Sequence, residues 1–295
     1  MSQMKTLYDR IKSTGPMVVA PGAYDCITAR LIEQAGYAAV YMTGAGTSVA
    51  HGLPDYGLLT MSEMVGNARR ITGAIGVPLV SDSDTGYGNE LNAYRTVQEF
   101  ERAGVAAIHI EDQVFPKKCG HLEDKELVSL EDYVAKIRAA VAAKSSREFQ
   151  IIARTDSRAG AGFDEAVRRS NAALEAGADM VFLEAPQTMA EVEQVPRLVH
   201  GPCLLNVVLG GKTPPVNLRD AEKMGYRMAI LPGMLLASII GLCDKMLADV
   251  KETGVLAQPY STGGPAKTFA RFGAAEWDER RTAFRDPPAK RKAAE

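Results

Sequence analysis

The sequence predicts an α/β fold of the (β/α)₈ TIM-type barrel class, and three observations support this prediction. Eight short apolar runs recur along the 295 residues, amphipathic helical segments separate most of them, and one connecting pattern occurs four times. Strands buried on both faces of a parallel sheet appear as continuous apolar runs rather than as alternating ones. Eight strand-then-helix units in a chain of this length indicate a closed barrel.

The expected strands follow one another along the chain. They span residues 17–20, 38–42, 79–81, 107–110, 151–153, 180–183, 204–207 and 228–231. Apolar residues at helical spacing fill the intervals between them, most clearly in five segments. These expected helices span residues 63–75, 91–102, 130–142, 164–176 and 235–250.

The repeated pattern is a helix-like stretch that ends at glycine and passes at once into an apolar run. It occurs at residues 32–41, 100–109, 174–183 and 221–231, with the glycines at Gly36, Gly104, Gly177 and Gly225. Glycine readily adopts the left-handed conformation that closes a helix. Each of these glycines is therefore expected to end a helix just before a strand.

Two segments differ from this regular plan. Residues 112–128 are long for a connection and contain three lysines, a glycine and a histidine, so this segment is a candidate lid. Residues 285–295 are charged and lack apolar periodicity, which predicts a disordered tail. Residues 1–284 are then expected to form a single barrel domain with a C-terminal helical extension.

The composition favours small-molecule chemistry. Lys and Arg total 34 against 36 Asp and Glu, so the charge gives no reason to expect a nucleic-acid or membrane partner. The first residues lack a secretory apolar segment and no membrane-length apolar run occurs, which predicts a soluble, cytoplasmic protein. The four cysteines contain no C-x-x-C pair and suggest neither a disulfide framework nor a zinc site.

Polar residues stand where six consecutive expected strands end. They are Tyr41, Thr43, Asp82, Asp84, His109, Glu111, Arg154, Asp156, Glu184 and Asn206. Any one of them could be an ordinary loop residue, and His109 could equally be a hydrogen-bonded core histidine. The carboxyl ends of barrel strands converge on one mouth, so six such ends in succession predict an active site.

Three of these residues, Asp82, Asp84 and Glu111, bring carboxylates together, and their repulsion must be offset by protonation or by a cation. Oxygen ligands without a nearby histidine and cysteine set favour Mg²⁺, with Mn²⁺ as the alternative, over zinc. No expected strand ends in lysine, which argues against a Schiff-base aldolase. Metal-assisted chemistry is the remaining expectation.

Cys119 lies in the sequence Lys-Lys-Cys-Gly-His of residues 117–121. Basic neighbours lower the pKa of a thiol, and Gly120 would let the backbone approach a ligand. A solvated basic loop with an incidental cysteine is the alternative. The position of this segment beside the expected mouth favours a reactive thiol.

Residues 18–247 resemble the isocitrate lyase and phosphoenolpyruvate mutase superfamily, whose members are Mg²⁺-dependent barrels acting on 2-oxo or 2-hydroxy acids. The resemblance rests on residues 41–46, 82–88, 109–113, 117–121 and 153–156. The cysteine at 119 is typical of the lyase branch, because many of the mutases and hydrolases have none at that position. The resemblance implies a retro-aldol lyase that cleaves a small 2-hydroxy dicarboxylic acid, 2,3-dimethylmalate-like or 2-methylisocitrate-like, to pyruvate or a similar 2-oxo acid and a second carboxylic acid.

The resemblance also implies a role for each site residue. Asp82 would hold Mg²⁺ directly, while Asp84, Glu111 and Asp55 would hold its waters. The substrate-binding set would be Thr43, Gly44, Ala45, Arg154 and Lys117 with Gly120, His121, Glu184 and Asn206, the last four facing the departing acid. Tyr41 would take the hydroxyl proton and Cys119 would protonate the released carbanion, with His109, Glu111 and Arg154 completing the catalytic set.

Details of the sequence narrow the substrate. Residues 206–211 and Ala237 depart from the 2-methylisocitrate lyases, which carry an arginine at the latter position for a third carboxylate. Residues 210–214 look closer to the 2,3-dimethylmalate lyases, oxaloacetate hydrolases and the petal death protein group. The resemblance therefore favours a malate-like dicarboxylate, and it implies a homotetramer whose subunits exchange C-terminal helices.

Two other hypotheses stay open at this point. An oxaloacetate decarboxylase or hydrolase, or a phosphonate (carboxyphosphonoenolpyruvate) mutase, would use the same Mg²⁺ site without needing the thiol. A binding or regulatory barrel without catalysis would bind oxalate or pyruvate but turn over no 2-hydroxy diacid.

Overall fold

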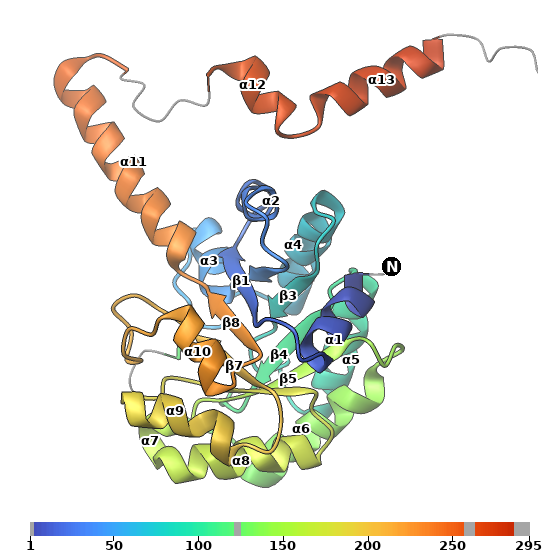
Figure 1. The fold of residues 1–295 in the computed structure, drawn as a ribbon, viewed down its shortest axis with the longest axis vertical. Coiled ribbons are helices and arrows are strands. Elements are labelled where there is room, and N and C mark those ends of the chain that lie inside the picture. Colours follow the sequence, from blue (N-terminus) through green and yellow to red (C-terminus); the bar gives the residue numbers. More distant parts are fainter. Residues whose placement is uncertain (1–2, 121–124, 257–262, 286–295) are drawn as a thin grey trace, which may run out of the picture. The chain divides into compact units, whose positions relative to one another are not determined.

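The computed structural model describes residues 3–120, 125–256 and 263–285. Eight parallel strands close into a barrel in sequence order, and the first strand pairs with the last (Figure 1). The strands are β1 (Val18–Ala23), β2 (Val40–Met42), β3 (Leu79–Asp82), β4 (Ala107–Glu111), β5 (Gln150–Thr155), β6 (Met180–Leu183), β7 (Cys203–Asn206) and β8 (Met228–Leu231). The predicted (β/α)₈ barrel and all eight of its strands are confirmed.

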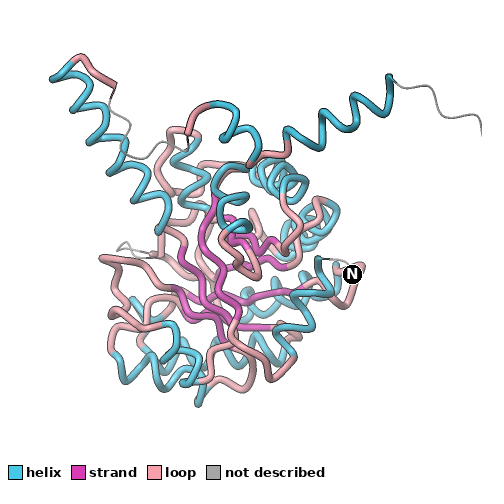
Figure 2. The backbone as a smooth tube through the Cα atoms, turned by 45° about the horizontal axis from the view of Figure 1, so that its top comes forward, coloured by secondary structure: helices cyan, strands magenta, loops and turns pink. Residues whose placement is uncertain are grey.

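Helices cover the outside of the strands in residues 1–240 (Figure 2). The helices of the described residues are α1 (Gln3–Lys12), α2 (Cys26–Gln34), α3 (Gly44–Ala50), α4 (Met61–Ala74), α5 (Glu90–Arg102), α6 (Leu130–Ala143), α7 (Arg158–Ala161), α8 (Phe163–Glu175), α9 (Met189–Leu198), α10 (Leu218–Met224), α11 (Met234–Thr253), α12 (Pro265–Ala270) and α13 (Ala274–Arg285). The five helices predicted from apolar periodicity correspond to α4, α5, α6, α8 and α11.

The four helix-ending glycines adopt the expected backbone conformation. The φ angles are 84° at Gly36, 86° at Gly104, 104° at Gly177 and 107° at Gly225. Residues with a side chain rarely occupy this left-handed region, because Cβ then crowds the backbone. These glycines stop α2, α5, α8 and α10 and turn the chain into the next strand.

One strand is longer than predicted because its apolar run ends before its hydrogen bonding does. The prediction stopped β1 at Ala20, but Pro21 still pairs with Leu231 of β8. A Cβ atom at Gly22 would overlap the backbone of Pro232. The proline and glycine that interrupt the apolar run thus allow β1 to pack closely against the end of β8.

Two groups of apolar side chains form the core. One fills the barrel interior with residues such as Val80, Ile152 and Phe182, and α1 adds Leu7 and Ile11 to it. The other lies between the strands and the surrounding helices. Successive strand residues alternate between the two groups, which keeps the strands buried on both faces.

Residues 1–240 form one compact unit and residues 241–295 a second. The second unit contains the rest of α11 together with α12 and α13. The predicted division into a domain of residues 1–284 and a tail stays a prediction, and residues 286–295 of that tail lie outside the described residues. No helix of the described part of the chain is long and apolar enough to cross a membrane.

Candidate active site

The carboxyl ends of the strands form one rim of the barrel, and the predicted polar side chains gather there. They lie on β2 to β7 or directly after these strands, which are parallel and end on the same side. The predicted polar residues that belong to the strands themselves are all buried. The closure of the barrel thus brings together side chains that lie far apart in the sequence.

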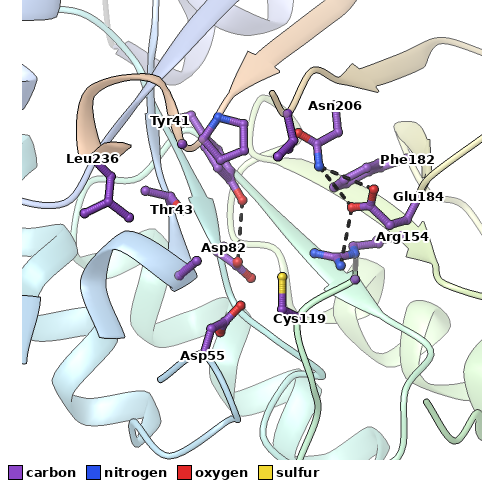
Figure 3. Close-up of a pocket in the computed structure, with 15 residues that line it drawn as sticks. Tyr41, Thr43, Asp55, Asp82, Cys119, Arg154, Phe182, Glu184, Asn206 and Leu236 are labelled. Carbon is purple, nitrogen blue, oxygen red and sulfur yellow. Dashed lines mark hydrogen bonds and ion pairs between the residues drawn. The ribbon is translucent and has the colours of Figure 1, made fainter. Parts of the chain in front are cut away.

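A cavity of about 120 Å³ opens at this rim (Figure 3). Pockets for drug-sized ligands usually measure ~300 to 1,000 Å³, so this cavity suits a small metabolite. It is lined by Tyr41, Thr43, Ala45, Asp55, Asp82, Cys119, Gly120, Arg154, Phe182, Glu184, Asn206, Val208, Pro232, Gly233 and Leu236.

Ten of the predicted site residues are among those that line the cavity. Five others, Gly44, Asp84, His109, Glu111 and Lys117, lie behind them and contact a lining residue. The remaining one, His121, lies outside the described residues. The roles expected for all of these residues stay predictions.

The backbone holds Asp82 firmly at the end of β3. The N–H of Gly44 donates to its Oδ2 at 3.2 Å, and the N–H of Asp84 donates to its Oδ1 at 3.0 Å. Burial opposes ionisation, but His109 and the cations Lys117 and Arg154 outweigh it and lower the pKa of Asp82. Asp82 is therefore a fixed carboxylate.

The ammonium of Lys117 lies between two carboxylates. Its Nζ is 2.5 Å from Oδ1 of Asp55 and 2.9 Å from Oδ1 of Asp84. Burial favours the neutral amine, but the carboxylates, led by Asp84, raise the pKa of Lys117 well above its ordinary value. The predicted substrate-binding lysine thus neutralises part of the acidic cluster in this structure.

The acidic cluster fits a divalent cation by its chemistry. Among the residues that the structure describes, no group of three His, Cys, Asp or Glu is already arranged around one point, because Lys117 and Arg154 lie between the acids. Neither carboxylate oxygen of the buried Glu111 accepts a hydrogen bond from the described residues, although Oε2 lies 3.2 Å from Nη1 of Arg154 in an ion pair. Oxygen donors of this kind suit Mg²⁺ or Mn²⁺.

Tyr41 and His109 form a buried hydrogen bond beneath the cavity. The hydroxyl of Tyr41 is 2.8 Å from Nε2 of His109 and 3.5 Å from Oδ2 of Asp82. Burial, followed by the charge of Asp82, raises the pKa of Tyr41 well above its ordinary value. Burial also lowers the pKa of His109 to about 4, so a protonated phenol faces a neutral imidazole across this hydrogen bond.

Arg154 provides the positive charge on the opposite wall. Its guanidinium lies 3.2 Å from Glu111, 2.9 Å from Asp156 and 3.4 Å from Glu184, and it stacks on the ring of Phe182. Burial favours the neutral form, but the acids raise the pKa of Arg154 well above its ordinary value. A charged guanidinium is therefore held in the cavity wall, and a group of this kind can bind a carboxylate through two parallel hydrogen bonds.

Cys119 reaches the cavity between the acidic wall and Arg154 (Figure 3). The segment before it is fixed by Gln113, whose amide accepts the N–H of Lys118 at 3.0 Å and donates to the Lys118 carbonyl at 2.8 Å. The base of the loop is closed by an antiparallel bridge between Gln113 and Leu127. The thiol thus lies on the same rim as Asp82.

Sequence reasoning missed the apolar part of the wall. Phe182, Val208, Pro232, Gly233 and Leu236 line the cavity but were not among the predicted site residues. Phe182 belongs to the predicted sixth strand, and the others follow the seventh and eighth. Their position directly after these strands was the available signal, because the loops that follow barrel strands build the mouth.

Known proteins of one enzyme family are similar to this chain along the barrel. Residues 8–251 match the family model described as phosphoenolpyruvate phosphomutase. The chain is 51% identical to the 2,3-dimethylmalate lyase of Eubacterium barkeri over 88% of each protein. It is 43% identical to the 2-methylisocitrate lyase of Aeropyrum pernix, covering 81% of this chain and 77% of that protein.

Solved structures agree with these relatives. A crystal structure of 2,3-dimethylmalate lyase, described as a PEP mutase/isocitrate lyase superfamily member, superposes with a TM-score of 0.91 at 36% identity, covering 100% of this chain and 99% of that one. A phosphonopyruvate hydrolase in complex with oxalate and Mg²⁺ gives a TM-score of 0.83 at 30% identity, covering 96% and 98%.

Proposed function

The chain belongs to the phosphoenolpyruvate phosphomutase family and is a carbon–carbon lyase like its curated relatives, and from this we propose the reaction that it catalyses. The enzyme cleaves a small 2-hydroxy dicarboxylic acid, malate-like and related to 2,3-dimethylmalate, into pyruvate or a similar 2-oxo acid and a second carboxylic acid. The observation that carries the proposal is the thiol of Cys119 in the cavity between Asp82 and Arg154.

The acidic wall would hold the divalent cation. We assign Asp82, Asp84, Asp55 and Glu111 to Mg²⁺, with Mn²⁺ as the alternative. A bound cation supplies electrostatic stabilisation of the negative charge that develops on the 2-oxo acid half. The Mg²⁺ in the similar phosphonopyruvate hydrolase supports this assignment.

The protein side chains supply the proton transfers. Tyr41 takes the proton of the substrate hydroxyl as the carbonyl forms, and because Tyr41 is itself protonated, its own phenolic proton passes along the hydrogen bond to Nε2 of His109. The bond between the hydroxyl-bearing carbon and its neighbour breaks, and its electron pair stays on the departing acid. Cys119 then gives its thiol proton to the carbon of the departing acid that holds this electron pair. The reaction therefore involves no net oxidation or reduction.

Binding groups surround this path. Arg154 and the backbone of residues 43–45 face the 2-oxo acid half, while Gly120, Glu184 and Asn206 face the departing half. We assign His121, which lies outside the described residues, to the departing half as well. Asn206 donates to Oε2 of Glu184 at 3.1 Å, which orients that carboxylate in the cavity. Besides Arg154, the lining supplies no second guanidinium for a third carboxylate among the described residues, which supports a dicarboxylate substrate.

The decisive experiment replaces Cys119 with serine or alanine. Cleavage of substituted malates, followed as pyruvate formation with Mg²⁺ present, should fall by ~100-fold or more because the general acid is lost. Oxalate binding should persist, and Cys243→Ser, a change in an exposed thiol that is not among the lining residues of the cavity, serves as the control. Full turnover without the Cys119 thiol would instead favour a hydrolase, decarboxylase or mutase acting at the same site.

The predicted homotetramer and cytoplasmic location belong to this proposal as well. Large apolar side chains of residues 241–285, among them Leu247, Trp277 and Phe284, are exposed in the single chain. Large apolar side chains that are exposed together in one region of a chain often mark a protein interface. We propose that a second copy of this chain covers it by exchange of C-terminal helices, and light scattering should then give the mass of four chains.

A further inference from the structure

Asp156 is a buried carboxylate after β5 that contacts two elements of the site at once. Its Oδ2 accepts a hydrogen bond from Nε of Arg154 at 2.9 Å, and its Oδ1 accepts one from Nη2 at 3.2 Å. The same Oδ1 lies 3.1 Å from Nζ of Lys125, on the far side of the loop that carries Cys119. One carboxylate therefore holds both the substrate-facing guanidinium and the cysteine loop.

The backbone of Gly120 completes this junction. Its carbonyl accepts a hydrogen bond from the ammonium of Lys125, which thereby bridges Gly120 and Asp156. A Cβ atom at Gly120 would overlap side-chain atoms of Arg154, Asp156 and Glu184. The residue next to the thiol thus packs directly on the Arg154–Asp156 pair, with no room for a side chain.

Asp156 is itself fixed from behind the cavity. Its N–H donates to Oδ1 of Asp112 at 2.8 Å. Oδ2 of Asp112 accepts hydrogen bonds from the hydroxyl of Thr155 at 2.6 Å and from Nη1 of Arg169 at 3.1 Å. These contacts anchor the backbone of Asp156 independently of Arg154 and Lys125, so the carboxylate is a rigid reference point.

The charge of Asp156 suits this task. Burial opposes ionisation, but Arg154 and then Lys125 lower its pKa to about 2. An ionised carboxylate with two cationic partners makes charge-assisted hydrogen bonds, which are stronger than neutral ones. Breaking such buried pairs is costly, because it leaves an uncompensated charge.

We propose that Asp156 is a positioning residue that sets the distance between Arg154 and the thiol of Cys119. It acts on the thiol through Lys125 and Gly120, and on the substrate through Arg154. The inference rests on the proposed function, in which Arg154 grips the acid and Cys119 protonates the released carbon. Asp156 contacts Arg154 and Lys125 separately, so the proposal predicts different effects for Asp156→Asn and Lys125→Met.

The first experiment measures alkylation of Cys119 by iodoacetamide, followed on its peptide by mass spectrometry, and needs no activity. Lys125→Met and Asp156→Asn should each accelerate alkylation on the order of 10-fold or more, because the loop is freed. The control Lys144→Met breaks a comparable pair with Asp179, 2.8 Å long. An unchanged rate in Lys125→Met would overturn the proposal, even if Asp156→Asn failed to fold.

The second experiment measures oxalate binding by calorimetry in the presence of Mg²⁺. Asp156→Asn should weaken binding on the order of 10-fold, because Arg154 loses the carboxylate that holds it at two nitrogens, whereas Lys125→Met should stay within about 2-fold of the parent protein. Equal weakening by both changes would contradict the separation. In turnover assays Lys125→Met should lower kcat with little change in KM, and Asp156→Asn should affect both.

These measurements distinguish the inference from the proposed function. Alkylation and oxalate binding report on Asp156 whether or not malates are cleaved. Failure of cleavage with the expected alkylation pattern would remove the proposed function alone, while normal cleavage with unchanged alkylation would remove the inference alone.

Discussion

At the scale of single residues, Lys117 shows that a sequence motif can identify a site residue without predicting the direction of its side chain. The sequence identifies Asp82 and Asp84 as acidic site residues, because an aspartate at the end of a strand has little freedom of direction. A lysine has four rotatable bonds, so its sequence position does not determine which way it points. The structure directs Lys117 to Asp55 and Asp84.

This position of Lys117 predicts an effect on cation binding. Lys117→Met removes a positive charge from the acidic cluster, so Mg²⁺ or Mn²⁺ should bind about 10-fold more tightly, because a nearby like charge repels the cation. Isothermal titration calorimetry with each ion measures this. Lys223→Met, at an exposed pair with Asp220, should leave the affinity unchanged. Weaker cation binding to Lys117→Met would contradict the interpretation.

Cys203 offers a test of burial without catalytic chemistry. It is 1% exposed on β7, and burial raises its thiol pKa from 9.0 to about 12. Between these values the unfolded chain releases a proton that the folded chain keeps, so stability is lost as the pH rises. If Cys203 is a buried structural thiol, the free energy of unfolding should therefore fall at alkaline pH.

The comparison with Cys203→Ala isolates this effect. Urea unfolding at about pH 8 and about pH 10.5 should show the parent protein losing ~2 kcal/mol more than the variant over that interval. Other groups contribute to both proteins and cancel in the difference. Parallel curves at the two pH values would show that the thiol is solvated.

At the scale of helices and strands, the sequence predicted the barrel strands because each is a continuous apolar run, and the long helices because each carries an apolar pattern of helical period. Short elements such as α3 and α7 were not predicted, because four to seven residues are too few to show a helical period. The extension of β1 through Pro21 was missed because its pairing with the neighbouring strand β8 leaves no sign in the local sequence. Tertiary pairing determined that boundary.

The helix-closing glycines predict a sign difference between two alanine substitutions. Gly36 has a φ of 84° with nothing near its Cβ position, so Gly36→Ala should lower the free energy of unfolding by about 1 kcal/mol through backbone strain alone. Gly66 lies inside α4, also in open space, so Gly66→Ala should raise it by about 0.5 to 1 kcal/mol. Chemical denaturation measures both, and effects of the same sign would refute the argument.

At the scale of the whole molecule, the barrel was predictable and the surroundings of residues 241–285 were not. The interior is specified by apolar strands of one chain, whereas Trp277 and Phe284 stay exposed among the residues that the structure describes. A single sequence carries the pattern of its own core but only an indirect record of other copies. The family resemblance, rather than the residue pattern, suggested the tetramer.

The proposed assembly predicts a change in mass. Replacing Trp277 and Phe284 together by serine should shift the particle from four chains to a smaller species, because two large aromatic contacts are lost. Size-exclusion chromatography with light scattering measures this. Leu91→Ser, at an exposed position of α5, should leave the mass unchanged. A tetramer that survives the double change would place the interface elsewhere.

The pairing of β1 with β8 has a consequence for biosynthesis. Val18 and Met228 are partners in the ring, so the last seam cannot form until nearly all of the barrel has left the ribosome. Until then the nascent sheet has two unpaired edges, which can recruit strands from neighbouring chains and aggregate. After closure no unpaired strand edge remains in the barrel. The risk of aggregation through such edges therefore belongs to folding and not to the mature enzyme.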